Sequence, residues 1–104
     1  MKPFDIFIAY VSWGDSGKTR PVLVYKIDDE IVHVYSITSQ YVSKSVTIQA
    51  QYLTIIDWKE AGLDRPSYVD AGEIVELPII ALSSKLFIGK LSEADRKRLL
   101  EFLA

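Results

Sequence analysis

The sequence predicts a mainly β protein with a C-terminal helix, built as a small and mostly antiparallel barrel of about five to seven strands. Two observations predict this class. Short β-branched runs alternate with turn residues along most of the chain, and one segment with helical spacing closes it. A length of 104 residues fits one domain, so residues 1–104 are expected to form a single unit.

The centre of the predicted barrel is a hairpin. Residues 22–27 and 31–37 are two apolar runs rich in β-branched side chains, and the acidic turn 28–30 separates them. Both runs are too continuously apolar for a sheet with one solvent-exposed face. We therefore expect both faces of this hairpin to be covered.

A first strand is expected before the hairpin, at residues 4–11, because apolar side chains recur there with a period of two. A polar loop at 12–19, with two glycines, is expected to follow. Pro21 would then open the second strand, at its first position, where a missing amide donor does least harm.

Several shorter elements are expected after the hairpin. Residues 45–51 alternate as a fourth strand with Val46 and Ile48 inward, and 57–61 form one helical turn that Gly62 ends and Trp58 anchors. Further short strands are predicted at 67–69 and 73–77, followed by a helical or irregular segment at 81–85 and an extended piece at 86–88.

The terminal helix has the clearest boundary. Ser92 is expected to cap the helix 93–103, and Asp95 stands at the carboxylate position of a capping box. The helix carries a broad apolar stripe, so it is expected to lie on the sheet or in a subunit interface. The stripe consists of Leu99, Leu100, Phe102 and Leu103.

Composition narrows the possible functions. The chain has no cysteine and one histidine, His33, which we interpret as a structural side chain in the middle of a strand. No metal site and no cofactor are therefore expected. Without a signal-like or bilayer-spanning run, the chain is expected to be cytoplasmic and not to bind membranes. The net charge of −2 requires a local basic patch for any polyanion.

Arg20 and Thr38 are the first candidates for a site, because the predicted hairpin brings its two open ends side by side. A guanidinium beside a hydroxyl can bind a phosphate. The alternative is that Arg20 pairs with a surface carboxylate and that Thr38 only ends a strand, since threonine favours strands.

Four ordered blocks resemble the MazF/PemK toxins of type II toxin–antitoxin systems: KTRPVLV at 18–24, ITS at 37–39, GLDRPSYV at 62–69 and IGKLS at 88–92. The resemblance implies an SH3-like barrel and a homodimer. It also implies metal-independent cleavage of single-stranded RNA by 2′-hydroxyl attack, and neutralisation by a cognate antitoxin protein. By the same resemblance Arg20 and Thr38 would be the catalytic pair, with Asp15, five positions before Arg20, as a third catalytic residue.

Four further residues are candidates for RNA contacts. Trp13 could stack on an unpaired base, Lys18 and Lys44 could bind phosphates, and Ser39 could support Thr38. Each also has an ordinary alternative, a packing lid for the tryptophan and a solvated surface charge for the lysines. Asp70 falls near a polar position of the third block and is given no role.

Two other functions remain open from the sequence. A non-catalytic relative within the same barrel class, such as a CcdB-like poison, would bind DNA gyrase instead of cutting RNA. A degenerate member would bind RNA or a protein partner without cleavage. The joint presence of Arg20 and Thr38 favours the nuclease, because a guanidinium and a hydroxyl can stabilise the charge that builds on a phosphate under attack.

Overall fold

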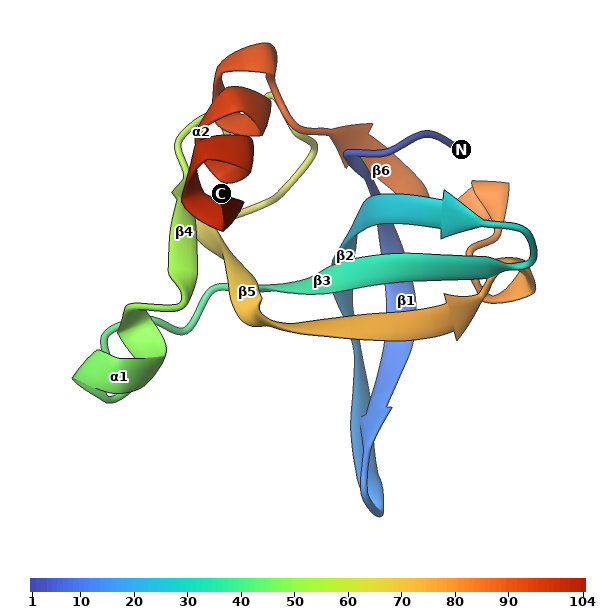
Figure 1. Cartoon of the computed structure of the whole chain (residues 1–104), viewed down its shortest axis with the longest axis horizontal. Helices are drawn as coiled ribbons and strands as arrows, with labels where there is room; N and C mark the ends of the chain where they lie inside the picture. The colour runs from blue at the N-terminus through green and yellow to red at the C-terminus, as the bar shows by residue number, and fades with distance from the viewer.

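The computed structural model describes residues 1–104 apart from the side chain of Trp13. Six strands form one sheet in the order β4-β5-β3-β2-β1-β6, with every neighbouring pair antiparallel (Figure 1). The predicted class, mainly β with a C-terminal helix, is confirmed. The strands are β1 Asp5–Trp13, β2 Ser16–Asp28, β3 Ile31–Thr38, β4 Tyr52–Ile55, β5 Ser67–Pro78 and β6 Phe87–Lys90.

The central hairpin is confirmed. Asp28 pairs with Ile31, so β2 and β3 are joined by a two-residue turn in which Asp29 has a positive φ of 58°. Successive residues of β2 enter different hydrophobic clusters, since Val22 and Val24 belong to one and Leu23 to the other. Both faces of the hairpin are therefore covered, as its continuous hydrophobicity predicted.

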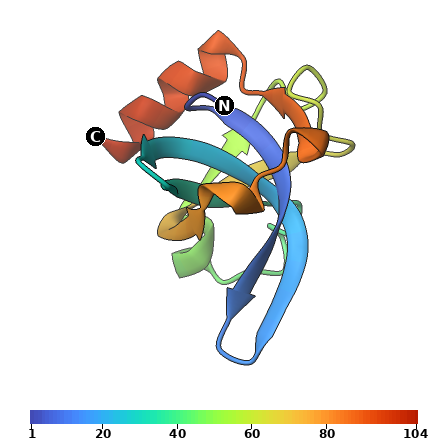
Figure 2. The ribbon, with the colours of Figure 1, turned by 90° about the vertical axis from the view of Figure 1, so that its right-hand side faces the viewer.

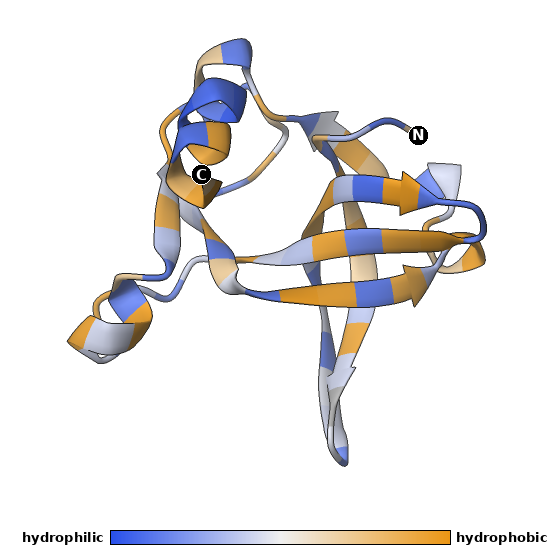
Figure 3. Cartoon of the chain, viewed as in Figure 1, coloured by the Kyte–Doolittle hydropathy of each residue, from blue (hydrophilic) through white to orange (hydrophobic). Residues whose placement is uncertain are grey.

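The two hydrophobic clusters lie on opposite faces of the central strands. The helix-side core lies beneath the C-terminal helix and consists of Ile6, Leu23, Tyr35, Ile37, Leu53, Ile55, Ala61, Leu63, Val69, Leu91 and Leu99. The second core consists of Phe7, Ala9, Val11, Val22, Val24, Val32, Val34 and Leu82. Figure 3 shows hydrophobic segments along β2, β3 and β5.

The predicted polar loop at 12–19 is wrong. β1 continues to Trp13 and β2 starts at Ser16, so only two residues join the strands, with Gly14 at a φ of 56°. The tip of the β1–β2 hairpin projects away from the sheet and covers no core (Figures 1 and 2). Its residues are therefore polar although they are extended, and this polarity led to the wrong prediction of a loop. Pro21 consequently lies inside β2, opposite Ile8, and not at its first position. Proline is tolerated at this position because β3 pairs with β2 only from Val22 onward, so Pro21 lies outside that pairing.

The predicted strand at 45–51 is also wrong. Ser45 caps a short helix, α1 Val46–Gln49, by accepting a hydrogen bond from the Ile48 amide at 3.3 Å. Val46 is 82% exposed, so the alternation of apolar residues does not reflect burial. The strand comes immediately afterwards as β4, which the sequence did not predict.

The two short strands expected at 67–69 and 73–77 are one bent strand, β5. Its pairing with β3 shifts register between Tyr35 and Ile37, which accommodates the bend near Gly72.

The helical turn at 57–61 is confirmed by a hydrogen bond from the Ala61 amide to the Asp57 carbonyl at 3.0 Å. Two 3-10 turns, η1 Ile79–Ala81 and η2 Ser84–Leu86, lead into β6, broadly as expected.

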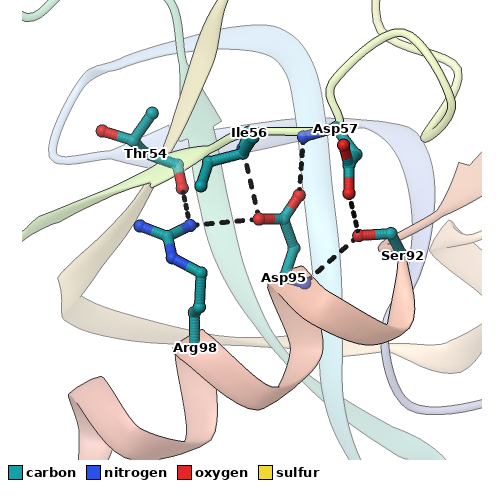
Figure 4. A network of polar contacts seen from close by, with 6 residues as sticks. All are labelled: Thr54, Ile56, Asp57, Ser92, Asp95 and Arg98. Atoms are coloured by element: carbon teal, nitrogen blue, oxygen red, sulfur yellow. Dashed lines mark hydrogen bonds and ion pairs between the residues drawn. The ribbon is translucent and has the colours of Figure 1, made fainter.

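The C-terminal helix α2 has the predicted bounds, Glu93–Leu103, and the predicted cap, in which the Ser92 hydroxyl oxygen accepts from the Asp95 amide at 3.1 Å. The Asp95 carboxylate has a different role from the one expected. It is 1% exposed and accepts hydrogen bonds from the Ile56 and Asp57 amides at 3.2 and 2.8 Å (Figure 4). Asp95 therefore ties the helix to the segment after β4.

Arg98 completes this tie, because its guanidinium lies 3.0 Å from Asp95 and donates to the Thr54 carbonyl at 2.7 Å. Leu99 is fully buried against the sheet, whereas Leu100 and Phe102 are 48% and 42% exposed. The helix thus lies on the sheet with half of its apolar stripe open to solvent.

Candidate active site

The open end of the β2–β3 hairpin forms a cavity of about 420 Å³. Arg20 and Thr38 both line it, so the two side chains that the sequence placed together share one solvent-accessible space. Its apolar wall comes from Ile8, Pro21, Ile37, Leu63 and Ile88. This juxtaposition meets the geometric condition for a phosphate site at the hairpin ends.

The strand register explains why these two residues meet. Val22–Ser36 is the last pair of β2 and β3 at the open end of the hairpin, and Arg20 and Thr38 each lie two residues beyond it on their own strand. The Thr38 hydroxyl oxygen accepts a hydrogen bond from the Gln40 amide at 3.1 Å, which orients the side chain. This contact uses a lone pair, and the hydroxyl can still donate to a ligand.

Charge in the first cavity is locally positive although the chain is acidic. Lys18, Arg20 and Arg65 line it with a single carboxylate, Asp64, which lies 3.2 Å from Arg65. Arg20 also borders a second cavity of about 120 Å³, which Ser36, Asp70 and Glu73 line as well. Arg20 therefore borders one cavity that is lined mainly by cations and another that is lined by two carboxylates.

Tyr52 lies within electrostatic range of the same arginine. Burial raises the pKa of Tyr52 above its ordinary value, the Asp70 carboxylate raises that pKa further, and the Arg20 guanidinium lowers it. The phenol therefore keeps its proton to a higher pH than an ordinary tyrosine does.

Three tyrosines form a cluster that the sequence did not indicate. The ring of Tyr41 stacks on Tyr68 with centroids 4.6 Å apart and planes 14° apart. Tyr52 lies 6.2 Å from Tyr41 and 6.4 Å from Tyr68. The only signal for this cluster is the alternation within β4 and β5, which becomes visible once those strands are known.

Of the other predicted site residues, Lys18 and Ser39 line the first cavity with the catalytic candidates. Asp15 stands at the exposed tip of the β1–β2 turn and lines neither cavity. Lys44 is half-buried in the connection from β3 to α1 and also lines neither. The side chain of Trp13 lies outside the described residues.

Sequence reasoning gave no role to several residues of the third block that line the cavity, among them Asp64, Arg65 and Ser67. Ser67 donates a hydrogen bond to the Arg65 carbonyl at 2.8 Å, which holds the loop against the cavity. Gly62 also lines it, with a φ of 91°, and a Cβ there would overlap the Ile88 carbonyl. The block thus shapes one side of the site.

Within the described part of the chain, no group of three or more His, Cys, Asp or Glu side chains is placed to hold a metal ion. None of the described helices has the length and hydropathy needed to cross a membrane.

The six-stranded sheet with α2 on one face is a MazF-like fold. The structure is similar to the Mycobacterium tuberculosis toxin MazF-mt6, with a TM-score of 0.70 and 25% sequence identity over 95% of this chain and 91% of that one. The resemblance seen in the sequence is therefore confirmed. No family model and no curated protein matches the sequence itself.

Proposed function

We propose that this chain is a sequence-selective endoribonuclease toxin that cleaves single-stranded mRNA at the cavity of Arg20 and Thr38. The observation that supports this most directly is that Arg20 and Thr38 line one cavity at the open end of the hairpin. The likeness of the fold to that of a MazF toxin also supports the proposal.

The chemistry follows from these two groups. A ribose 2′-hydroxyl gives up its proton to a base and its oxygen attacks the adjacent phosphorus, with negative charge building on the non-bridging oxygens. The bond to the 5′-oxygen breaks and that oxygen takes up a proton, which leaves a 2′,3′-cyclic phosphate and a 5′-hydroxyl. Arg20 can donate N–H groups and Thr38 its hydroxyl to the non-bridging oxygens, which lowers the barrier without a metal ion. Lys18 and Arg65 line the same cavity and would hold the neighbouring phosphates.

The same proposal covers the wider setting of the toxin. We expect a homodimer in the cytoplasm, where a cognate antitoxin covers the RNA site until it is removed. The exposed apolar side chains of α2 offer a surface that a second copy or the antitoxin could bury. Asp15 remains a predicted catalytic residue by resemblance alone.

Cleavage of an unstructured RNA tests the proposal. We expect the wild-type protein to cut it equally well with and without a chelator, and Arg20→Ala to slow cleavage on the order of 10²- to 10³-fold. Lys26→Ala is the matched control, because Lys26 is an exposed cation on the same strand, at the closed end of the hairpin.

Two results would contradict the proposal. Absence of cleavage by wild type on any RNA would exclude the nuclease, and loss of cleavage on chelation would exclude the metal-free mechanism. Circular dichroism of Arg20→Ala shows whether its fold is intact.

A further inference from the structure

The tyrosine cluster lies on the sheet face opposite the helix-side core. Leu53 and Ile55 of β4, and Val69 of β5, belong to that core. Because successive side chains in a strand point to opposite faces, Tyr52 and Tyr68 point away from it. Their face is the one toward which Thr38 points, since Ile37 is in the helix-side core.

The register places this cluster directly beside the proposed catalytic hydroxyl. Tyr68 is the cross-strand partner of Thr38, and Tyr52 is the partner of Asp70. Directly opposed residues have Cβ atoms roughly 4.5–5.5 Å apart on one face of the sheet. Tyr68 is thus the immediate lateral neighbour of Thr38, and β2, the strand that carries Arg20, lies on the other side of β3.

The cluster combines aromatic surface with access to solvent. Tyr41, Tyr52 and Tyr68 are each half-buried, so none of the three is sealed in a core. Tyr41 comes from the connection after β3, which carries it over Tyr68. Arg20 lies within electrostatic range of Tyr52 and supplies the cation that accompanies aromatic rings at single-stranded nucleic-acid sites.

We propose that Tyr41, Tyr52 and Tyr68 bind the nucleobase adjacent to the phosphate held by Arg20 and Thr38, an inference that rests on the proposed ribonuclease function. The three tyrosines line neither cavity, so the link is Thr38, which lines the first cavity and is the cross-strand partner of Tyr68. The base stacks on the tyrosine rings while its phosphate is held at Thr38 and Arg20. Stacking on aromatic rings tolerates every base, because each base has a π face. The cluster therefore positions the scissile nucleotide, and sequence selection would come from other contacts.

Binding of two uncleavable probes tests this inference. One is a 2′-O-methyl RNA 12-mer of randomised sequence, and the other is an abasic 12-mer with the same number of phosphates. We expect the wild-type protein to bind the first on the order of tenfold more tightly than the second. Tyr41→Leu and Tyr68→Leu should bring this ratio close to one while leaving the affinity for the abasic probe unchanged.

Two variants serve as controls. Tyr41→Phe keeps the ring and should keep the ratio, and Tyr25→Leu removes a half-buried tyrosine that packs against Tyr35 instead. Thermal melting shows which variants are folded. If Tyr68→Leu melts early, Tyr41→Leu decides the question, because Tyr41 lies in a connection outside the strands.

The outcomes separate this inference from the proposed function. An unchanged ratio in folded Tyr41→Leu, or a wild-type ratio near one, overturns the nucleobase site whether or not RNA is cut. A wild-type ratio near ten that collapses in Tyr41→Leu supports the site. If the wild-type protein then fails to cleave a 2′-hydroxyl RNA, the nuclease is wrong while the base-binding site stands.

Discussion

The two faces of the sheet at the open end of the central hairpin differ sharply, although their residues alternate along the same strands. On the face toward α2, Ile37, Leu53 and Val69 are at most 8% exposed. On the other face, their immediate neighbours Thr38, Tyr52 and Tyr68 are half-buried and polar or aromatic. A shift of one residue thus changes a buried core position into a half-buried one on the other face, because the side-chain period of a strand is two. Ile37 belongs to the core and also forms part of the cavity wall.

The largest expected effect concerns the sheet face toward α2. Ile37→Ala should lower the free energy of unfolding by about 2–5 kcal/mol, because it removes a buried side chain from the helix-side core and leaves a cavity. Urea denaturation measures this loss. A change below about 0.5 kcal/mol, the range of ordinary surface substitutions, would contradict the contrast between the faces.

Thr38→Val tests the opposite face of the sheet, at the residue that follows Ile37. Valine keeps the β-branched shape but lacks the hydroxyl, so we expect cleavage to slow on the order of 10²-fold and stability to fall by about 1 kcal/mol through loss of the contact to Gln40. Single-turnover RNA cleavage and urea denaturation measure the two quantities. Unchanged cleavage in a folded Thr38→Val protein would remove Thr38 from the mechanism.

The smallest expected effect concerns alkaline pH. The pKa of Tyr35 is raised by burial and by Tyr25, and that of Tyr52 by burial and Asp70 against the lowering effect of Arg20. The folded state therefore holds these protons more tightly than the unfolded state does. The resulting stability is present below the ordinary tyrosine pKa of 10.0 and is lost as pH rises through the folded values.

Melting temperatures at about pH 8 and about pH 11 measure this loss. We expect a smaller drop in Tyr52→Phe than in wild type, since phenylalanine does not titrate. An equal drop in both proteins would show that Tyr52 makes no contribution.

Local signals predicted some elements well and others badly. The acidic turn between two apolar runs and the Ser92 cap were sufficient for the central hairpin and for α2, because turns and caps are made by neighbouring residues. The segment 45–51 failed since two apolar residues in alternation suit a strand as well as an exposed helical turn. The loop at 12–19 failed because strand pairing with a partner, and not polarity, decides whether a segment is extended.

The candidate site was predictable in part for the same reason. Arg20 and Thr38 could be paired from the sequence, because one hairpin joins them. Gln40 and Arg65 could not be assigned, since their place at the cavity depends on loops that the strands only position in three dimensions. Tyr68 could not be placed beside Thr38 without knowing that β5 pairs with β3.

By itself, the sequence determined the central hairpin, the capped terminal helix and the meeting of Arg20 with Thr38, because each depends on residues close together in the chain or joined by one turn. Only the tertiary structure decided that β5 is a single bent strand, that Asp95 ties α2 to the segment after β4, and that three tyrosines gather beside Thr38. Those features need contacts between residues far apart in sequence, and their register is set by packing of the whole sheet.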